Sequence, residues 1–575
     1  MKKALKAFIN KEADAQVEQI REMWEKPLKE RVRAGEAIAN ITVVHNYSGE
    51  RLTLRCSENH SKFRVGDYLR LHQGNPDGRN VYGCKVLEEL GNELIVEAGY
   101  RVNFYGVQPS DDWVLDRNLV DIRHILIKAL GRMGHREMRL LTKTTSPAFN
   151  PRKVEQARIL PQITSLNDSQ QAAFINAFSA ENYYLIQGPP GTGKTWLLGH
   201  LAHALAKKGE RVLISALSHR AINNALRQTY ATHYYPHIIK IGEEYNATGL
   251  QWKSGMVRNY KSLSQSPYNE YSSGLIVGST VYALHTRKLA RMDFDTVIFD
   301  EAGQMTLPLA LAGMVKAKRC IFIGDHQQLA PVLSAEYEEE ETIQQSIFQA
   351  LHNVDNSTML TKTYRMNEEI NAFPSHHFYN KKLVAGLVAA HRKLELKQLS
   401  SVFPVVLDPN IPSVFIDLAH RDKDIRCREE AILITKIILE AVNCGVSPAE
   451  IAVVAPYRAQ GRLIRNMLYS TPSSIAPIDL KSIVVDTVER IQGQERELIL
   501  ISLTSSDPKH IAANARFFLR PNRLNVAITR AKTKRIVVGS RYLFNNNLIE
   551  GQLRECLDLF KAFYESCHIV DGSDI

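Results

Sequence analysis

Residues 188–195 read Gly-Pro-Pro-Gly-Thr-Gly-Lys-Thr and directly follow the apolar run Tyr183–Ile186. This is the spacing G-x-x-x-x-G-K-[ST], placed where a strand would pass into a helix beginning near Trp196. Its glycines let the backbone curl so that N–H groups converge on phosphate oxygens, and the helix start adds a favourable dipole. The alternative is a glycine-rich turn with an incidental lysine, which the flanking strand and helix disfavour. The stretch therefore predicts a nucleoside triphosphate site.

Two side chains of this loop have separate predicted tasks. Lys194 would reach the β- and γ-phosphates, and the hydroxyl of Thr195 would ligate Mg²⁺. The predicted nucleotide-contacting residues of the loop are Gly188, Pro189, Pro190, Gly191, Thr192, Gly193, Lys194 and Thr195.

Length, composition and net charge limit which classes of protein this chain can belong to. A chain of 575 residues is too long for one core, which predicts several domains. Its 44% hydrophobic and 23% charged residues are ordinary for a globular protein in water. The net charge of +11 fits a polyanionic partner but does not require one.

The cysteines and the amino-terminal stretch indicate the compartment. The seven cysteines are scattered without a C-x-x-C pair, which argues against a zinc ribbon, an iron–sulfur cluster or a disulfide framework. The basic start, Met-Lys-Lys, is not followed by a secretory apolar core, and no apolar stretch is long enough to span a bilayer. We expect a reducing, cytoplasmic location and no membrane partner.

The first part of the chain predicts a helix, a small antiparallel barrel and a second helix. Apolar residues recur at helical spacing up to about residue 35, and short β-type runs with turn signals follow residue 39. A further helical stretch runs from about 119 to 133, and proline and serine residues near 146–151 indicate a linker. The predicted domains are a helix over 1–36, a barrel over 37–115 and a second helix with linker over 116–150.

From Asn167 onward, apolar β-branched runs alternate with helical stretches. Near-continuous apolar strands between helices are typical of parallel sheets covered on both faces. The acidic run at 336–341 separates two such sets, which predicts one lobe over 151–335, with an insertion at 229–273, and a second over 336–575. The predicted strands are 183–186, 212–215, 296–299, 321–323, 451–454, 482–485, 498–501 and 536–538.

Two further motifs follow predicted strands, at the edge where open α/β sheets place ligands. Asp300 would hold Mg²⁺ through its water shell, and Glu301 would orient and deprotonate the water that attacks the γ-phosphate. An acidic helix start is the alternative, and the phosphate loop disfavours it. In the stretch 324–331, Gln328 carries a donor and an acceptor and could therefore sense the γ-phosphate.

Two arginines in the second half, Arg365 and Arg530, have a predicted catalytic role. A guanidinium brought from another lobe can stabilise the charge that develops on the γ-phosphoryl oxygens. ATP would then close the gap between lobes and hydrolysis would reopen it. For either arginine taken singly, a surface ion pair is the alternative.

The ordered motifs resemble those of superfamily 1B helicases of the nonsense-mediated-decay, senataxin and immunoglobulin-mu-binding type. The resemblance covers almost the whole chain, because the segments before Asn167 are similar to the stalk and barrel of that group. The stretches that carry it are 167–170, 188–195, 300–304, 324–331, 364–366, 455–460, 492–495 and 523–532.

The resemblance implies a fold and a set of site residues. The fold would be α/β, with two tandem RecA-like lobes of the phosphate-loop class. ATP and Mg²⁺ would bind between the lobes, and the motor would move 5′→3′ on single-stranded RNA or DNA. The implied nucleotide contacts are Gln170 at the adenine edge, Tyr364 on the ring and Glu495 near the ribose and phosphates. Asn167 and Gly493 are also implied nucleotide-binding residues. The implied strand contacts are Ser218, His219, Asn223, Ser279, Thr280, Pro456 and Tyr457.

The chain also departs from its relatives. His219 and Asn223 stand where relatives commonly carry Asn and Asp, and Thr363 replaces a frequent Gln. The cysteine–histidine-rich, nuclease and zinc-finger modules of some relatives are absent from this sequence. We therefore expect a bare, monomeric motor that a separate protein recruits or regulates.

Two other functions remain open from the sequence. An ATP-gated clamp or scaffold would grip nucleic acid and recruit partners without productive unwinding, and the intact catalytic residues do not separate it from a motor. A phosphate-loop kinase or small-molecule ATPase would leave the later motifs unexplained.

Overall fold

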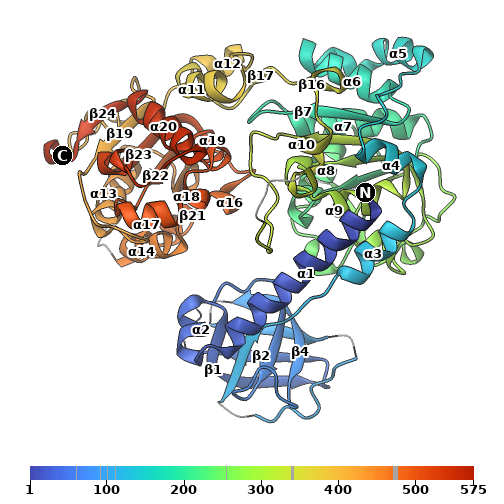
Figure 1. Cartoon of the computed structure of the whole chain (residues 1–575), viewed down its shortest axis with the longest axis horizontal. Coiled ribbons are helices and arrows are strands. Elements are labelled where there is room, and N and C mark those ends of the chain that lie inside the picture. Colours follow the sequence, from blue (N-terminus) through green and yellow to red (C-terminus); the bar gives the residue numbers. More distant parts are fainter. Residues whose placement is uncertain are drawn as a thin grey trace.

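The chain begins with a long helix that runs from the first sheet lobe to a small barrel (Figure 1). This helix, α1 (Lys2–Glu25), buries Leu5 and Ile9 in the same cluster as Leu130 of α3 (Arg123–Gly131). Pro27 separates it from α2 (Leu28–Ala34), so the predicted single helix is two helices. The computed structural model describes residues 1–575 except 58, 60, 91, 100, 110–111, 254, 338–341 and 471–476, and not the side chains of 245, 354, 477 and 478.

Between α2 and α3 lies a closed antiparallel barrel with the strand order β1-β2-β5-β4-β3-β6. Inward-facing apolar residues such as Leu52, Leu54, Leu69 and Val96 alternate with outward polar ones, which is the period-two pattern of a half-buried strand. Its strands are β1 (Ala37–Tyr47), β2 (Arg51–Arg55), β3 (Tyr68–His72), β4 (Tyr82–Leu90), β5 (Glu93–Ala98) and β6 (Trp113–Arg117).

Lobe 1 is an eight-stranded parallel sheet with the order β12-β9-β13-β8-β14-β15-β7-β16. Its strands are β7 (Tyr183–Gln187), β8 (Val212–Ser215), β9 (Ile238–Ile241), β12 (Arg258–Tyr260), β13 (Ile276–Gly278), β14 (Phe294–Phe299), β15 (Ala317–Gly324) and β16 (Ser357–Met359). The helices around it are α4 (His135–Leu141), α5 (Pro151–Arg158), α6 (Asp168–Ser179), α7 (Lys194–Lys207), α8 (His219–Thr232), α9 (Leu307–Met314) and α10 (Ile347–Leu351).

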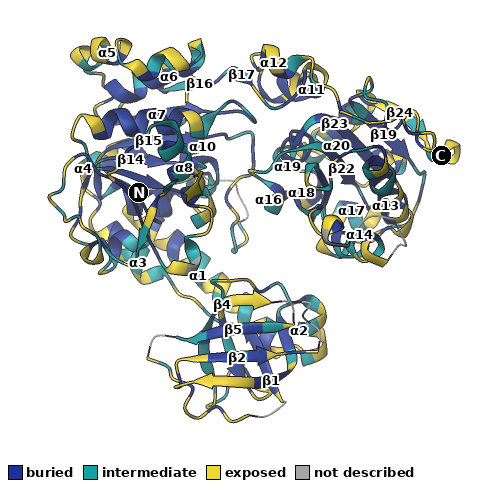
Figure 2. Cartoon of the chain, turned by 180° about the vertical axis from the view of Figure 1, so that it is seen from behind, coloured by how far each residue is buried: buried dark blue, intermediate teal, exposed yellow. Residues whose placement is uncertain are grey.

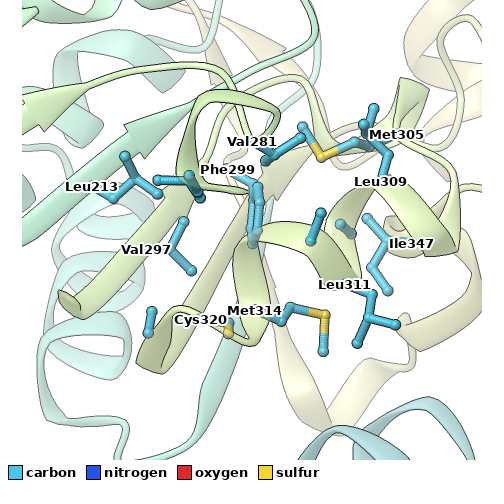
Figure 3. Packing of buried hydrophobic residues seen from close by; sticks show 14 of the residues in the cluster. Leu213, Val281, Val297, Phe299, Met305, Leu309, Leu311, Met314, Cys320 and Ile347 are labelled. Atoms are coloured by element: carbon cyan, nitrogen blue, oxygen red, sulfur yellow. The ribbon is translucent and has the colours of Figure 1, made fainter. Parts of the chain in front are cut away.

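Successive residues of the lobe-1 strands point into two different cores. Val297 and Phe299 pack with α9 and α10, whereas Ile298 packs with α6 and α7 on the opposite face. In Figure 3, Phe299 lies among Met305, Leu309 and Met314. Apolar side chains are therefore required at every strand position, which explains the continuous apolar runs in the sequence.

Lobe 2 is a six-stranded parallel sheet with the order β21-β20-β22-β23-β19-β24. Dark blue strands at the centre of each lobe and yellow outer helices mark the two separate cores in Figure 2. The strands are β19 (Ser413–Asp417), β20 (Ile451–Ala455), β21 (Val484–Thr487), β22 (Arg496–Ser502), β23 (Ala531–Gly539) and β24 (His568–Asp571). The helices are α11 (Glu368–Phe378), α12 (Leu387–Ala390), α13 (Arg428–Asn443), α14 (Arg458–Ser470), α15 (Pro477–Leu480), α16 (Val488–Ile491), α17 (Pro508–Ala513), α18 (Ala515–Phe518), α19 (Pro521–Ile528) and α20 (Gln552–Glu565).

The predicted fold class is confirmed: the chain is α/β, with two RecA-like parallel-sheet lobes, a small barrel and flanking helices. Two details differ from the sequence-based boundaries. The predicted insertion 229–273 supplies β9 and β12 to the sheet. Lobe 1 also continues past residue 335, because α10 packs into its core and β16 pairs with β7. The acidic residues 338–341 of the predicted boundary lie outside the described residues.

Two short strand pairs lie outside the barrel and the two large sheets: β10 (Gln251–Trp252) with β11 (Gly255–Met256), and β17 (Lys362–Thr363) with β18 (Val384–Ala385). All seven cysteines are free, and six of them are buried. Among the described residues, no helix has the length and apolar character needed to cross a membrane.

Candidate nucleotide and nucleic-acid site

The predicted phosphate loop lies between β7 and α7, at the carboxyl edge of the lobe-1 sheet. The helix begins at Lys194, with Gly193 as its N-terminal cap. The side chain of Lys194 folds over Gly188, where a Cβ would lie 2.1 Å from the lysine Cγ. Lys194 Nζ donates to the carbonyl of Gly188 over 2.6 Å. The loop therefore presents its lysine and the N-terminal N–H groups of α7 together, which is the arrangement that binds phosphate.

The side chains predicted to contact the base lie together at the start of α6. Asn167 caps this helix, and its Nδ2 donates to the hydroxyl of Tyr364 at 2.8 Å. The Oε1 of Gln170 accepts the N–H of Asn167, and its Nε2 donates to the carbonyl of Thr192 at 3.0 Å. Gln170 thus braces the phosphate loop in this conformation, while Tyr364 is 45% exposed and presents an accessible ring.

Asp300 and Glu301 directly follow β14, beside the phosphate loop. Burial, reinforced by the charge of Glu301 and opposed by that of Lys194, raises the pKa of Asp300 to about 7. Glu301 has a φ of 53°, in the left-handed region that non-glycine residues rarely adopt, and such strain is common at functional sites. A carboxyl at Asp300 and the hydroxyl of Thr195 are oxygen donors, which suit Mg²⁺, and a cation there would favour the ionised carboxylate.

A buried hydrogen-bond network links the loop after β15 to lobe 2. Asp325 Oδ2 accepts from Gln328 Nε2 and from the hydroxyl of Tyr379, each at 2.8 Å. Asn525 on α19 donates its Nδ2 to the same Tyr379 hydroxyl at 2.8 Å and to the carbonyl of Gln327. Burial and the charge of Asp325 keep the pKa of Tyr379 well above its ordinary value, so the phenol stays a donor. Gln328 therefore sits within a continuous connection between the lobes.

The chain segment that enters lobe 2 packs directly on the phosphate loop. Tyr364 donates its N–H to the carbonyl of Gly191, and Thr363 Oγ1 donates to the carbonyl of Pro190. Gly191 has a φ of 73°, and a Cβ there would lie 2.4 Å from the Cβ of Arg365. Only glycine fits at this position, because both the backbone angle and the close approach exclude a side chain.

Both predicted arginines lie at the interface between the lobes. Arg365 Nε donates to Glu495 Oε2 at 2.6 Å, and 10% of the Arg365 side chain is exposed. Arg530 is 1% exposed, and its Nε donates to the carbonyl of Val526. Burial, followed by repulsion from Arg365, lowers the pKa of Arg530 to about 9, while Glu301 of lobe 1 opposes this shift. Arg530 is therefore within electrostatic reach of the predicted catalytic carboxylate.

The remaining two predicted nucleotide contacts lie on the lobe-2 side of this interface. Glu495 is held by Arg365, and this partner, with nearby Lys532 and Arg530, lowers the pKa of Glu495 against the opposing effect of burial. Gly493 lies two residues before Glu495 and has a φ of 77°, in the left-handed region. A Cβ added at this glycine would have no atom within 4 Å, so the space beside it is open. The backbone carbonyl of Gln494, the residue between Gly493 and Glu495, accepts a hydrogen bond from Arg530 Nη1 at 3.5 Å.

The strand contacts predicted in lobe 1 differ in their accessibility. Ser218 caps α8 by accepting the N–H of Ala221, and Thr280 is half-buried. Asn223 is 4% exposed and donates to two loop carbonyls, and Ser279 is 0% exposed and donates to the carbonyl of Ile241. Neither Asn223 nor Ser279 reaches the surface in this conformation.

His219 lies where lobe 1 approaches the barrel. Burial, followed by the charges of Lys240, Lys85 and Lys288, lowers the pKa of His219 to about 4, so the imidazole is neutral at physiological pH. Lys85 belongs to β4 of the barrel. Positive side chains from the barrel and from lobe 1 therefore converge beside the start of α8, where Lys288 is ion-paired with Glu243.

In lobe 2, the predicted contacts Pro456 and Tyr457 form the loop between β20 and α14. The ring of Tyr457 is nearly parallel to that of Phe518, with centroids 6.3 Å apart, and its hydroxyl is bonded to His510 at 3.2 Å. Burial raises the pKa of Tyr457, so the hydroxyl stays protonated. This loop is half-buried and supported from behind by aromatic side chains.

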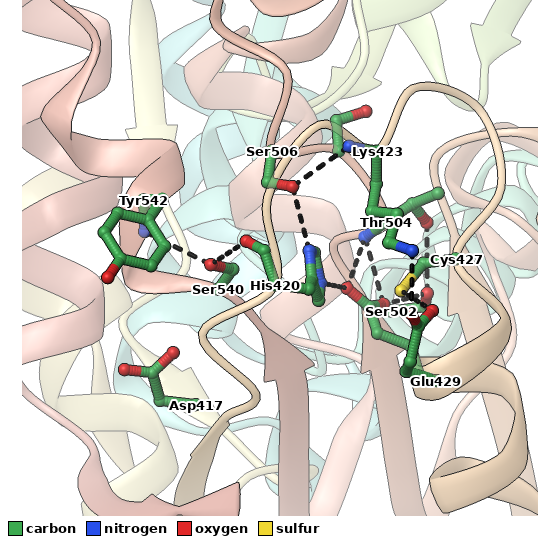
Figure 4. A network of polar contacts seen from close by, with 12 residues as sticks. Asp417, His420, Lys423, Cys427, Glu429, Ser502, Thr504, Ser506, Ser540 and Tyr542 are labelled. Atoms are coloured by element: carbon green, nitrogen blue, oxygen red, sulfur yellow. Dashed lines mark hydrogen bonds and ion pairs between the residues drawn. The ribbon is translucent and has the colours of Figure 1, made fainter.

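A buried polar network holds the elements beside this loop (Figure 4). Glu430 on α13 accepts from His420 Nε2 at 2.7 Å and from the N–H of Thr504, and Ser502 Oγ also donates to it. Gln460 of α14 donates to Ser502 Oγ at 3.1 Å. The starts of α13 and α14 are thus fixed to the end of β22.

The sequence-based selection missed several residues of the interface. Asp325 and Asn525 lie inside stretches that carried the resemblance, and their positions after a strand and on a helix could have drawn attention to them. No sequence pattern points to Tyr379, because its partners Asp325 and Asn525 are 54 and 146 positions away.

Comparisons with known proteins agree with the motifs. Two family profiles, both described as an AAA domain, match residues 165–382 and 343–542. The DNA replication ATP-dependent helicase/nuclease JHS1 of Arabidopsis thaliana is 28% identical over 441 residues, which cover 73% of this chain and 32% of the relative. The regulator of nonsense transcripts 1 homolog of Neurospora crassa is 27% identical over 557 residues, which cover 86% of this chain and 50% of the relative.

The alignments span a third to a half of these relatives' own lengths. A crystal structure of Arterivirus nonstructural protein 10 (helicase) covers 92% of this chain and 82% of that chain, at 13% identity and a TM-score of 0.39. The relatives named as regulators of nonsense transcripts and the two AAA-domain matches confirm the predicted resemblance: in sequence, this chain is similar to superfamily 1 helicases.

Proposed function

We propose that this chain is an ATP-dependent nucleic-acid helicase or translocase that hydrolyses ATP between its two sheet lobes. The observation that carries the proposal is the composite site. The phosphate loop and Glu301 come from lobe 1, whereas Arg365 packs on Gly191 from the segment entering lobe 2 and Arg530 lies within reach of Glu301. A site divided between two bodies couples a chemical step to their relative motion.

The proposed nucleotide contacts follow from this placement. The loop 188–195 and Lys194 hold the phosphates, and the exposed ring of Tyr364 stacks on the base. Asn167 and Gln170 would border the adenine edge, with Gln170 exchanging its present bond to Thr192 for one to the base. Thr195 and Asp300 would hold Mg²⁺, which neutralises phosphate charge when bound.

The proposed chemistry is general-base attack of water with charge stabilisation from lobe 2. Glu301 would take the proton of the attacking water, since it follows the buried strand β14 beside Asp300. Arg530 and Arg365 would face the γ-phosphoryl oxygens, where negative charge develops. Arg365 is paired with Glu495 in this conformation, so closure would move its guanidinium from the carboxylate to the phosphate.

The nucleic acid is proposed to lie across both lobes, on the side of the barrel. Lys85 of the barrel lies near His219 and Lys288 of lobe 1, and Arg64 of the barrel lies near Asp486 of lobe 2. Positive charge at these junctions suits a phosphate backbone, and Ser218, Thr280 and the Pro456–Tyr457 loop offer contacts without base specificity. The 5′→3′ direction on single-stranded RNA or DNA is part of the proposal, on the strength of the motif order. The proposal also includes a monomeric state, a separate recruiting protein and a cytoplasmic location.

The decisive test is hydrolysis of ATP with and without nucleic acid. We expect low basal turnover that single-stranded RNA or DNA raises strongly, and displacement of a strand from a duplex with a 5′ tail but not a 3′ tail. Lys194→Ala is the inactive control, because it removes the phosphate-binding ammonium. No stimulation by any polynucleotide would reject the motor, and stimulation without displacement would favour the ATP-gated clamp.

Tyr379→Phe tests the connection between the lobes. The substitution keeps the ring but removes the hydroxyl that joins Asp325 to Asn525, so we expect nucleic-acid-stimulated kcat to fall while KM for ATP changes little. Because a buried charged acceptor loses one of its donors, the free energy of unfolding should fall by about 1.5–3 kcal/mol. Steady-state kinetics and urea denaturation measure the two effects.

Tyr184→Phe provides a matched control within lobe 1. Its hydroxyl bonds Thr358 at 2.8 Å and Asn176 at 3.0 Å, and both partners belong to the same lobe. We expect this variant to lose stability but to keep stimulated turnover. Equal kinetic losses in the two variants would show that Tyr379 only stabilises the fold.

A further inference from the structure

The outer face of α14 carries a row of arginines that the nucleotide site does not use. Arg458, Arg462 and Arg465 are four and three residues apart, so they lie on the same side of the helix. An adjoining side of α14 is buried through Gln460, Gly461, Ile464 and Leu468. Arg458 is exposed, whereas Arg462 and Arg465 are half-buried. Arg458 directly follows the Pro456–Tyr457 loop, so the row begins where the proposed strand contact ends.

A fourth arginine is held beside this row by a two-point clamp. The N–H of Cys427 donates to Gln460 Oε1 and Gln460 Nε2 donates to the carbonyl of Cys427, both at 2.9 Å. Gln460 is 0% exposed and is itself bonded to Ser502. Arg426 is the residue before Cys427, so the clamp holds its backbone close to Arg458 and Arg462. Its side chain is exposed.

The four guanidinium groups concentrate positive charge with little compensation. Partial burial, then the charges of Arg465, Arg426 and Arg458, lower the pKa of Arg462. In the part of the chain that the structure describes, no carboxylate lies within ion-pair distance of Arg426, Arg458 or Arg462. The neighbouring Asp486 is paired with Arg490 at 3.6 Å, and Asp424 accepts the N–H of Ile425.

The barrel approaches the same surface. The electrostatic neighbours of Asp486 include Arg64 of the barrel together with Arg465 and Arg458 of α14. Arg64 is exposed, in the loop between β2 and β3. Positive charge thus continues from lobe 2 to the barrel around Asp486, which offsets part of it. Like charges held this close repel one another, and a polyanion lying along them would relieve that repulsion.

We propose that Arg426, Arg458, Arg462 and Arg465 form a binding face for nucleic-acid phosphates. This face would extend the strand path from Tyr457 along α14 toward Arg64. Guanidinium groups suit it because their planar donors pair with phosphate oxygens without reading the base. The inference rests on the proposed function, and it adds a second segment of the track to the strand contacts that the resemblance implies. Of the four arginines, Arg458 lies within a stretch that carries the resemblance, and the other three lie outside those stretches.

The test uses a triple variant of the full chain, Arg426→Ala/Arg458→Ala/Arg462→Ala. Arg465 is retained because it donates to the carbonyl of Val485 and so supports β21. The matched control, Arg152→Ala/Lys153→Ala/Arg158→Ala, removes the same charge from α5, on the far side of lobe 1 (Figure 1). Fluorescence anisotropy would measure the affinity for single strands of about 6 and about 24 nucleotides over a range of salt concentrations.

We expect the triple variant to bind the longer strand about tenfold or more weakly, with a salt slope reduced by about 0.7 for each arginine removed. Affinity for the shorter strand, which fits within the motif contacts, should change less than threefold, and the α5 control should match wild type for both. An Arg→Lys triple variant should keep most of the salt slope, because the charge remains.

Three outcomes would overturn the inference. Equal loss in the α5 control would mean that net charge alone matters, and no loss in the α14 variant would mean that the face does not touch the strand. Polyglutamate that competes as strongly as the longer oligonucleotide would assign the face to an acidic protein segment. If wild type binds no oligonucleotide at all, the proposed function itself fails, which is a distinct result.

Discussion

Arg530→Lys should lower kcat by about 10³-fold or more while leaving KM for ATP near wild type. The lysine keeps a positive charge but loses the planar fork that can contact two phosphoryl oxygens at once. The loss should appear in kcat because this contact would form fully only when the lobes close on the transition state. Single-turnover hydrolysis with saturating nucleic acid measures the chemical step directly.

A second buried arginine supplies the control for this prediction. Arg535 on β23 is also 1% exposed, but it donates to Ser413 and to the carbonyl of Ile370 inside lobe 2. Arg535→Lys should therefore reduce stability without a comparable loss of turnover. If the two variants hydrolyse ATP equally well, Arg530 does not act on the phosphoryl group and the composite site is wrong.

Glu301→Gln should retain ATP binding but lower turnover by about 10²–10⁴-fold. The amide has the same shape as the carboxylate, so it can still orient a water, but it cannot accept the proton. Removing the charge of Glu301 also removes one cause of the raised pKa of Asp300, so Mg²⁺-dependent nucleotide binding should not weaken. Equilibrium binding of a fluorescent ATP analogue and phosphate-release kinetics separate the two quantities.

The matched control is Glu368→Gln, an exposed carboxylate in the first turn of α11. It removes the same charge from lobe 2 without touching the phosphate loop, so its turnover should stay within twofold of wild type. Wild-type turnover in Glu301→Gln would assign the general base to another group. Loss of nucleotide binding would instead mean that Glu301 mainly organises the loop.

Local patterns predicted the strand–loop–helix arrangement around residues 188–195 and the two-lobed α/β fold well. In the loop 188–195, glycine spacing, the strand before it and the helix after it all agree, because each depends on neighbours only a few residues away. The buried parallel strands were equally visible, since both faces of each sheet are covered and every position must be apolar. The segment 229–273 was harder, because β9 and β12 are short and the pattern between them is irregular.

Short stretches of the sequence were enough to predict a phosphate-binding loop, acidic residues after a buried strand and arginines in a second lobe, since each of these depends on neighbouring residues alone. The folded chain showed which distant segments meet: Tyr379 joins Asp325 to Asn525, Arg365 packs on Gly191, and Gln460 holds Cys427, the neighbour of Arg426, beside α14. These contacts join segments that are many residues apart in the sequence. Sheet order and helix docking decide which such segments meet, and no local periodicity records that choice.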